Sequence, residues 1–177
     1  MATRKDAKGI AHVKVMTWQA TYKGILKDDY LKNMAVKPIR RSYSKWIGTD
    51  HATVMVLEDE GRVVGYASGG EARSEDHHGY GEIYALYVLP EYQGDGRGES
   101  LMYYMVQALR LRGYNDLVIW CLSKNPSQGF YKRLGGKSER AAQLTIGGEQ
   151  YLERAYIWQD VAAALTPNQL ETWIQTT

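Results

Sequence analysis

A glycine-rich turn between a predicted strand and a predicted helix constrains this chain more than any other segment. The apolar-rich run 82–88 is typical of a strand, and Pro90 ends it. Gly94, Gly96 and Gly98 follow, and apolar residues then recur at the spacing of a helix. Such a turn leaves the first N–H groups of the helix without partners, and together with the helix dipole they suit a phosphate group. On the glycines alone, a purely structural turn is an equally good interpretation.

The turn differs from two known nucleotide-binding motifs. A dinucleotide fingerprint would need glycine at position 99, where the chain has Glu99. A Walker loop would need Gly-Lys followed by Ser or Thr, and the chain has no such residues there. Both motifs are therefore excluded.

The order of the predicted elements indicates an α+β fold with a mixed sheet. Apolar spacing predicts helices early in the chain, and then a hairpin of two strands. The strand before Pro90 should run parallel to the strand at 117–122, because a helix connects them. The chain has no repeat or linker, so we expect one domain over residues 1–177. The predicted helices are 6–22, 27–34, 38–48, 101–112, 129–134 and one after a capping box at 166–169; the strands are 53–57, 62–67, 82–88, 117–122, 141–146 and 151–158.

Composition excludes several classes of protein. The formal net charge is +2 and the signs are interspersed, so no basic stripe for nucleic acid is expected. No apolar run approaches the ~20 residues that cross a bilayer, and the N-terminus does not resemble a secretory signal. Cys121 is the only cysteine, so an internal disulfide is impossible. A cytoplasmic location is the simplest expectation.

Four segments, in order along the chain, resemble the GNAT superfamily of N-acetyltransferases, and a bacterial subgroup in particular. The family's signature, Arg/Gln-x-x-Gly-x-Gly/Ala after a strand ending in Val-x-Pro, is matched by Gln93, Gly96 and Gly98. The resemblance implies helices on both faces of a mostly antiparallel sheet, with two splayed central strands. It also implies acetyl-CoA as co-substrate, a small-molecule primary amine as acceptor, and no metal. The other matching segments are 18–26, 125–135 and 154–160.

The same resemblance assigns residues to acetyl-CoA. Backbone groups of the splayed strand would contact the pantetheine arm and the thioester, and an N–H near Val88 would polarise the thioester carbonyl. The amides of the glycine-rich turn would hold the pyrophosphate. Asn125 would bond the cofactor arm, although an Asn before a proline is also an ordinary turn residue. The implied cofactor-binding residues are Leu86, Tyr87, Val88, Gln93, Gly94, Asp95, Gly96, Arg97, Gly98, Glu99, Asn125 and Tyr131.

Two residues are candidates for proton transfer. The resemblance makes Tyr131 the general acid that protonates the CoA thiolate, since a phenol has a pKa just above that of a thiol. The alternative is a helix tyrosine that only packs on the sheet. Glu82 is the candidate general base, either directly or through water. Glu82 could equally be an ordinary residue at a strand end, with neutral amine captured from solution. Trp18, Tyr22 and Tyr84 are candidates for the acceptor pocket, and each could instead be a core residue.

Other residues invite weaker interpretations. His77 and His78 adjoin two acidic residues, but adjacent histidines on an extended chain point apart, so we do not expect a metal site. Cys121 lies in an apolar strand and is expected to be a packed thiol rather than a nucleophile. Trp173 and Ile174 on the last predicted helix would suit a homodimer contact.

The chain departs from the family pattern at three places. Arg97 stands where the family has Ile or Val, so its side chain must turn outward or reach the phosphates. Gly136 stands where many relatives have Phe. The family's first strand would have to fit before Asp6, and it is expected to be vestigial or missing. Two other functions stay open: an idle acyl-CoA-binding or sensor module, and an acetyltransferase of protein N-termini.

Overall fold

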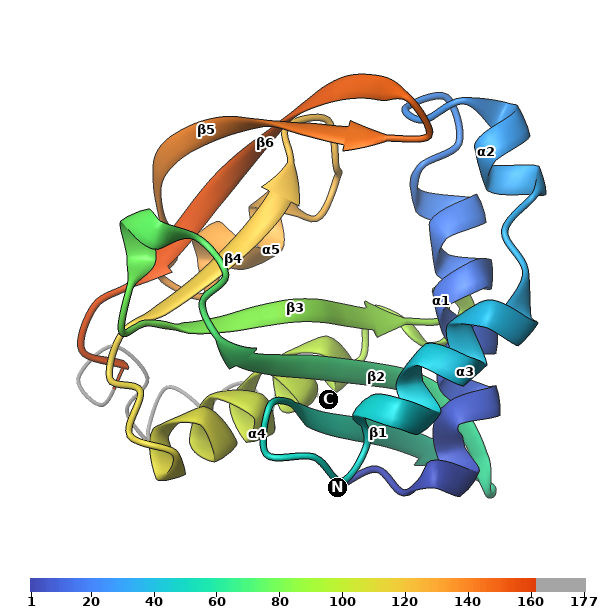
Figure 1. Ribbon diagram of the computed structural model, residues 1–177, viewed down its shortest axis with the longest axis horizontal. Helices are drawn as coiled ribbons and strands as arrows, with labels where there is room; N and C mark the ends of the chain where they lie inside the picture. Colours follow the sequence, from blue (N-terminus) through green and yellow to red (C-terminus); the bar gives the residue numbers. More distant parts are fainter. Residues whose placement is uncertain (162–177) are drawn as a thin grey trace.

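A computed structural model describes residues 1–161 as one six-stranded sheet with helices on both faces (Figure 1). The strand order is β1-β2-β3-β4-β6-β5, and only β3 and β4 pair in parallel. The predicted α+β fold with its single parallel step is therefore confirmed. The predicted capping box at 166–169 and the proposed contact residues Trp173 and Ile174 lie outside the described residues. The strands are β1 Thr53–Asp59, β2 Arg62–Glu71, β3 Gly81–Val88, β4 Leu117–Leu122, β5 Lys137–Ile146 and β6 Glu149–Trp158.

The helices follow the predicted ranges within a few residues. The third helix begins two residues before Pro38 rather than at it, because a proline is tolerated anywhere in the first turn, where its missing N–H is not needed. None of the helices within residues 1–161 is long and apolar enough to cross a membrane. The helices are α1 Ala7–Thr21, α2 Asp28–Lys32, α3 Val36–Trp46, α4 Arg97–Leu111 and α5 Gln128–Arg133, with 3₁₀ turns at Arg4–Asp6, Glu75–His77 and Pro90–Tyr92.

The two central strands separate soon after they begin. β3 and β4 pair only at Gly81 with Leu117 and at Glu82 with Val118. Beyond these pairs β3 continues beside β2, whereas β4 continues beside β6. Figure 1 shows the consequence: β1–β3 and β4–β6 diverge toward α1, so the sheet has two halves. This is the splay that the family resemblance implied.

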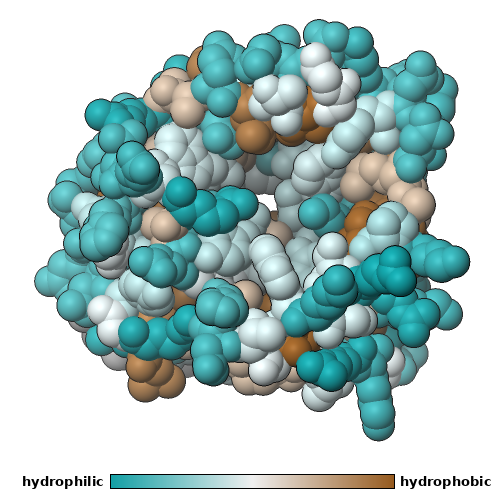
Figure 2. Space-filling view, in the orientation of Figure 1, coloured by the Kyte–Doolittle hydropathy of each residue, from teal (hydrophilic) through white to brown (hydrophobic). Residues whose placement is uncertain are grey.

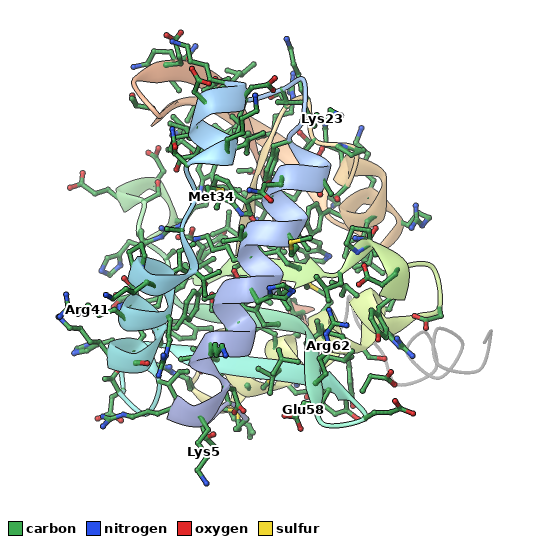
Figure 3. All side chains as sticks on the ribbon, turned by 90° about the vertical axis from the view of Figure 1, so that its right-hand side faces the viewer. Lys5, Lys23, Met34, Arg41, Glu58 and Arg62 are labelled. Atoms are coloured by element: carbon green, nitrogen blue, oxygen red, sulfur yellow. The ribbon has the colours of Figure 1, made fainter. Side chains whose placement is uncertain are left out.

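Two hydrophobic cores hold helices against opposite faces of the first half-sheet. On one face α4 packs through Met102, Met105 and Leu109, all fully buried. On the other face α1 and α3 pack against β2, with Ile10 among the buried residues. Tyr43 of this second core lies on α3. Figure 3 shows α1 running between the regions of Lys5 and Lys23, so that this one helix flanks both halves of the sheet.

One backbone hydrogen bond ties the N-terminal segment before α1 to β1. The Ala2 N–H donates to the Val54 carbonyl oxygen at 2.9 Å, and the 3₁₀ turn Arg4–Asp6 then leads into α1. Within residues 1–161 no strand precedes α1.

Gly136 has a packing explanation. A Cβ built on Gly136 would lie 2.6 Å from Cζ2 of Trp158 and 2.9 Å from the Tyr131 carbonyl oxygen. The indole is fixed there, because its Nε1–H donates to the Leu134 carbonyl oxygen at 2.7 Å. Trp158 thus fills the volume beside position 136, and a side chain at that position would clash with it.

Candidate active site

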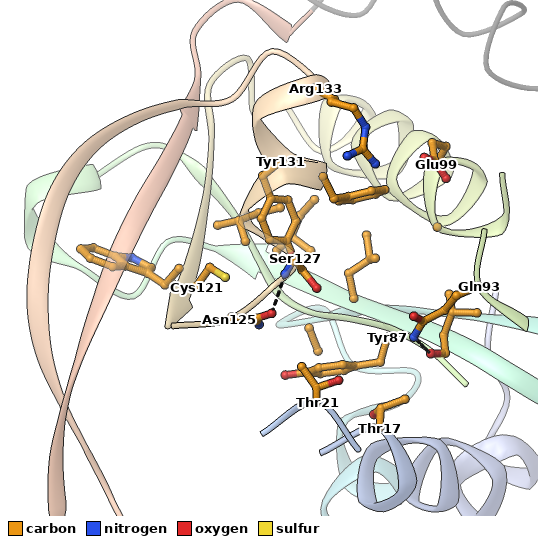
Figure 4. A pocket seen from close by; sticks show the side chains of 18 of the residues that line it. Thr17, Thr21, Tyr87, Gln93, Glu99, Cys121, Asn125, Ser127, Tyr131 and Arg133 are labelled. Carbon is orange, nitrogen blue, oxygen red and sulfur yellow. Dashed lines mark hydrogen bonds between the residues drawn. The ribbon is translucent and has the colours of Figure 1, made fainter. Parts of the chain in front are cut away.

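A cavity of about 380 Å³ lies where the two half-sheets diverge. Its walls come from β3, β4, the C-terminal half of α1, the glycine-rich turn before α4, and α5 (Figure 4). Figure 2 shows this face of the molecule hollowed at its centre, between β3 and the second half-sheet. Predicted site residues that line the cavity are Tyr22, Tyr84, Leu86, Tyr87, Val88, Gln93, Gly94, Gly96, Gly98, Glu99, Asn125 and Tyr131.

The glycine-rich turn forms a cradle of backbone amides at one end of the cavity. Gly94 and Gly96 have φ values of 89° and 80°, in the left-handed region that favours glycine. The N-cap residue of α4, Gly96, has no side chain to cap the helix, and the Gly94 and Gly96 amides have no acceptor among residues 1–161. In the first turn the Arg97 N–H donates to Oδ1 of Asp95 at 3.4 Å. Free amides at an uncapped helix N-terminus bind anions, so this end of the cavity can hold a phosphate group.

Two contacts fix the position of the cradle. The Gln93 Nε2 donates to the Val88 carbonyl oxygen at 2.7 Å, which ties the turn to the end of β3 (Figure 4). A Cβ on Gly98 would lie 3.3 Å from the Phe130 ring, so α4 and α5 approach closely here. The turn is therefore held by β3 on one side and by α5 on the other.

Arg97 turns outward, away from the cavity wall. Its Nε lies 3.0 Å from Oδ2 of Asp95, and its guanidinium stacks over the Tyr92 ring at 4.9 Å. A second carboxylate, Asp59 on β1, lies 3.8 Å away. The charged residue that replaces Ile or Val is thus neutralised on the outer side of the turn. Asp95 and Arg97, both predicted to bind the cofactor, are not among the residues that line the cavity.

Asn125 is both a turn residue and a wall of the cavity. Its Oδ1 accepts a hydrogen bond from the Ser127 N–H at 2.8 Å (Figure 4). Its Nδ2 donates to the Tyr22 hydroxyl at 3.1 Å, which links β4's C-terminal loop to α1. Burial raises the pKa of Tyr22 to about 12, so this hydroxyl is neutral at physiological pH.

Tyr131 is buried on α5 against aromatic rings. Its ring lies 5.3 Å from Phe130, 5.6 Å from Tyr156 and 6.5 Å from Trp158, centroid to centroid. Its hydroxyl makes no hydrogen bond with any residue in the described part of the chain. Burial raises the pKa of Tyr131 well above its ordinary value, so the phenol is protonated and able to donate.

Glu82 lies behind the cavity wall and is bound by Arg73. Its side chain is 1% exposed, and both carboxylate oxygens accept hydrogen bonds from Arg73. The Arg73 backbone N–H donates at 2.9 Å and its Nε lies 3.2 Å from each oxygen, while the terminal nitrogen makes a closer contact. A role for Glu82 as base would therefore require Arg73 to release it. Trp18 also stays off this cavity and lines a second hollow beside α2 and α3.

The surroundings of Cys121 and His77 favour neither a nucleophile nor a metal site. Burial raises the pKa of Cys121 to about 12, so its thiol is neutral although it lines the cavity. His77 is buried between the rings of Tyr80 and Trp120. Within residues 1–161 no three His, Cys, Asp or Glu side chains are grouped as metal ligands.

Sequence reasoning missed several residues of the site. Arg133 projects from α5 toward Glu99 at the mouth of the cavity, and no carboxylate of residues 1–161 is paired with it (Figure 4). Its position two residues after Tyr131 was a usable signal. Arg73 follows a strand end and had no such signal, because its contact with Glu82 depends on the path of the loop. The other missed lining residues are Thr17, Thr21, Ile83, Ala85, Ile119, Trp120, Ser127 and Phe130.

Comparison with known proteins agrees with this geometry. A sequence model of the acetyltransferase (GNAT) family matches residues 17–136. An uncharacterized N-acetyltransferase of Bacillus subtilis strain 168, YuaI, is 34% identical over 93% of this chain and 94% of its own length. An L-methionine sulfoximine/L-methionine sulfone acetyltransferase of Salmonella typhimurium is 38% identical, over 41% of this chain and 42% of its own length.

A solved structure shares the fold. The structure of yncA, a putative acetyltransferase from Salmonella typhimurium with its cofactor acetyl-CoA, superposes with a TM-score of 0.69. It covers 89% of this chain and 90% of its own length, at 21% identity. The family match over most of the chain, together with the full-length relative from Bacillus, establishes that this chain belongs to the GNAT family of acetyltransferases.

Proposed function

We propose that this protein transfers an acetyl group from acetyl-CoA to the primary amine of a small molecule, by direct attack in a ternary complex. The observation that carries the proposal is the cavity between β3 and β4, which joins the uncapped N-terminus of α4 to the protonated phenol of Tyr131. The acetyl-CoA in the similar Salmonella structure supports the choice of co-substrate.

The cavity offers acetyl-CoA three kinds of partner. The amides of Gly94 through Glu99 would hold the pyrophosphate, because they surround the N-terminus of α4 and, apart from the Arg97 N–H, which donates to Asp95 at 3.4 Å, lack acceptors among residues 1–161. Arg133 would add a positive charge at the mouth. Backbone groups of Leu86 to Val88 would contact the pantetheine arm, which can lie in the gap that opens where β3 leaves β4. Asn125 would supply a further polar contact.

Tyr131 is the proposed acid. When the amine attacks the thioester carbon, a C–N bond forms, the C–S bond breaks and a thiolate departs. Tyr131 would give its proton to that sulfur, and the phenolate formed would regain a proton from solvent. An N–H near Val88 would stabilise negative charge on the thioester oxygen. Holding both substrates together supplies much of the rate by orientation.

The incoming ammonium can lose its proton in two ways. Glu82 can accept it through water, if Arg73 moves. The alternative is that the enzyme captures the neutral amine from solution, and the hydrogen bonds from Arg73 to both oxygens of Glu82 favour this alternative. Tyr84 and Tyr22 line the cavity and would contact the acceptor or the acetyl group.

A coupled assay tests the proposal. Purified protein is mixed with acetyl-CoA and a panel of small primary amines, and both free thiol and the N-acetyl product are measured. We expect stoichiometric thiol and product with at least one amine, and intersecting double-reciprocal plots when both substrates are varied. Parallel plots would indicate a covalent acetyl-enzyme and contradict direct attack. Binding of acetyl-CoA without transfer to any amine would instead support an idle acyl-CoA-binding module.

A further inference from the structure

We propose that the second hollow, beside α2 and α3, is a binding site for a small organic monoanion with a flat apolar body, such as an aryl carboxylate. The hollow has a volume of about 500 Å³, and none of its lining residues lines the cavity between β3 and β4. Its walls come from α1, from residues 27–39 and from the turn between β5 and β6. The inference therefore concerns a different site from the one proposed for acetyl transfer, and it does not depend on that function.

The walls of the second hollow are held to one another by close contacts. The Gln19 Nε2 donates to the Leu31 carbonyl oxygen at 2.9 Å, which ties α1 to α2. A Cβ on Gly147 would lie 2.7 Å from the Tyr30 ring, so the turn between β5 and β6 packs directly on α2. Figure 3 shows Met34 in the connection between α2 and α3, beside α1. The hollow is therefore a formed part of the fold, bounded by three elements that contact one another.

Lys14 is a cation in the wall of the second hollow that lacks a counter-charge. Its side chain is half-buried on α1, and its Nζ lies 5.3 Å from the centroid of the Trp18 ring. The ammonium makes no hydrogen bond or ion pair with any residue in the described part of the chain. Burial lowers the pKa of Lys14, since nothing nearby compensates its charge. Buried lysines are normally paired, so an anion in the hollow would supply the missing partner.

The surrounding charge attracts an anion and favours a single negative charge on it. Residues 4–46, which contain α1, α2 and α3, have eleven Lys and Arg but only three Asp and Glu, whereas the net charge of the whole chain is +2. Among these eleven cations only Lys27 forms an ion pair within residues 1–161, with Glu149. Such an excess of positive charge raises the local concentration of anions. Asp29 lies in the wall of the hollow, however, so a dianion would meet more repulsion there than a monoanion.

The remaining wall of the second hollow suits a flat apolar group. The rings of Trp18 and Tyr30 lie 6.4 Å apart, centroid to centroid, with an angle of 44° between their planes. Met34 and Ile39 add aliphatic surface to the same wall. Binding pockets for small molecules commonly combine apolar and aromatic walls with one or two polar groups that fix orientation. Lys14 and these rings together therefore match a carboxylate attached to an aromatic ring.

Calorimetric titration with phenylacetate, phenylacetamide and phenyl phosphate tests the site. None of these probes carries an amine that can be acetylated, so binding is measured apart from acetyl transfer. We expect one phenylacetate per chain, bound roughly ten- to hundredfold more tightly than the neutral amide, the usual effect of a charge-assisted hydrogen bond. The dianion phenyl phosphate should bind more weakly than phenylacetate, and saturating CoA should leave the affinity for phenylacetate unchanged. Absence of saturable phenylacetate binding, equal binding of the amide, or displacement of phenylacetate by CoA would overturn the inference.

Substitution of Lys14 locates the anion. Lys14→Met should weaken phenylacetate binding roughly ten- to hundredfold and leave phenylacetamide binding unchanged, whereas Lys14→Arg should keep most of the affinity. Lys8→Met, on the exposed side of the same helix, is the matched control and should bind as wild type. Thermal unfolding checks that each variant is folded, and Lys14→Gln takes the place of Lys14→Met if the latter is not. Wild-type affinity for phenylacetate in the folded variant, or an equal loss for both probes, would contradict anion binding by Lys14.

Discussion

Replacing Tyr131 by Phe should separate catalysis from stability. The Tyr131 hydroxyl makes no hydrogen bond within residues 1–161, and the ring is held by Phe130, Tyr156 and Trp158. Phe keeps these ring contacts and removes only a hydroxyl that has no hydrogen-bond partner among residues 1–161. We therefore expect the free energy of unfolding to change by less than about 1 kcal/mol.

The effect on turnover should be much larger. Loss of a positioned general acid typically lowers the rate by about 10²–10⁴, which corresponds to about 2.7–5.4 kcal/mol of transition-state stabilisation. The KM and Kd for acetyl-CoA should change little, because the proposed proton transfer matters only as the C–S bond breaks. The assay combines thiol release at saturating substrates with thermal unfolding and titration of acetyl-CoA.

Tyr43→Phe is the matched control. The Tyr43 hydroxyl donates to the Tyr66 hydroxyl at 3.1 Å in the core on the opposite face of the first half-sheet. Its loss should cost about 0.5–1.5 kcal/mol of stability and leave turnover intact. The two variants should thus show opposite patterns. Turnover of Tyr131→Phe close to that of wild type would refute the assignment of the acid.

The pH dependence of turnover provides a second check on Tyr131. Because burial raises the pKa of this phenol above its ordinary value of about 10, the donor form is complete below pH 10. No fall in kcat between pH 7 and 10 should therefore arise from its ionisation. A fall in kcat between pH 7 and 10 that occurs in the wild type but not in Tyr131→Phe would contradict the raised pKa of Tyr131.

Three further predictions concern packing, cofactor affinity and the thiol. Gly136→Ala should lower stability by about 1–3 kcal/mol and the Tm by several degrees, because its Cβ would meet the fixed indole of Trp158; an unchanged Tm in calorimetry would contradict this packing. Arg133→Met should raise the KM for acetyl-CoA about tenfold with kcat preserved, whereas Lys132→Met on the same helix should not, and equal effects would refute a specific role for Arg133. Because burial raises the pKa of Cys121 to about 12, only about one part in ten thousand of this thiol is thiolate at pH 8. Native protein should therefore resist iodoacetamide, whereas unfolded protein should react. Rapid labelling of the native protein would contradict the burial of this thiol.

The fold was largely predictable because its elements carry local signals. Each of the six strands was anticipated as a run bounded by turn residues, including 141–146 and 151–158, which form the hairpin of β5 and β6. The start of the third helix was less certain, since Pro38 indicates a helix start only to within the first turn. The short segment before Asp6 leaves little room for the family's first strand, but nothing in the sequence indicates that the Ala2 N–H donates to the Val54 carbonyl oxygen.

The side-chain arrangement of the site was predictable only in part. The glycine-rich turn and Tyr131 belong to local patterns, and both line the cavity. Arg97 turns outward toward Asp95, a neighbour in sequence, but also toward Asp59, which lies on β1 and is distant in sequence. Likewise, Arg73 covers Glu82 only because the loop after β2 returns over the start of β3. Contacts between residues distant in sequence leave no periodic pattern in the sequence, so the structure is needed to find them.

The central claim is that the space between β3 and β4 binds acetyl-CoA, and calorimetric titration tests it most directly. Desulfo-CoA and NADP serve as controls for the thioester and for a nucleotide with similar phosphates. We predict saturable binding of one acetyl-CoA per chain, weaker binding of Arg133→Met at low salt, and no comparable binding of NADP. Absence of acetyl-CoA binding by folded protein, or equal binding of NADP, would contradict the claim.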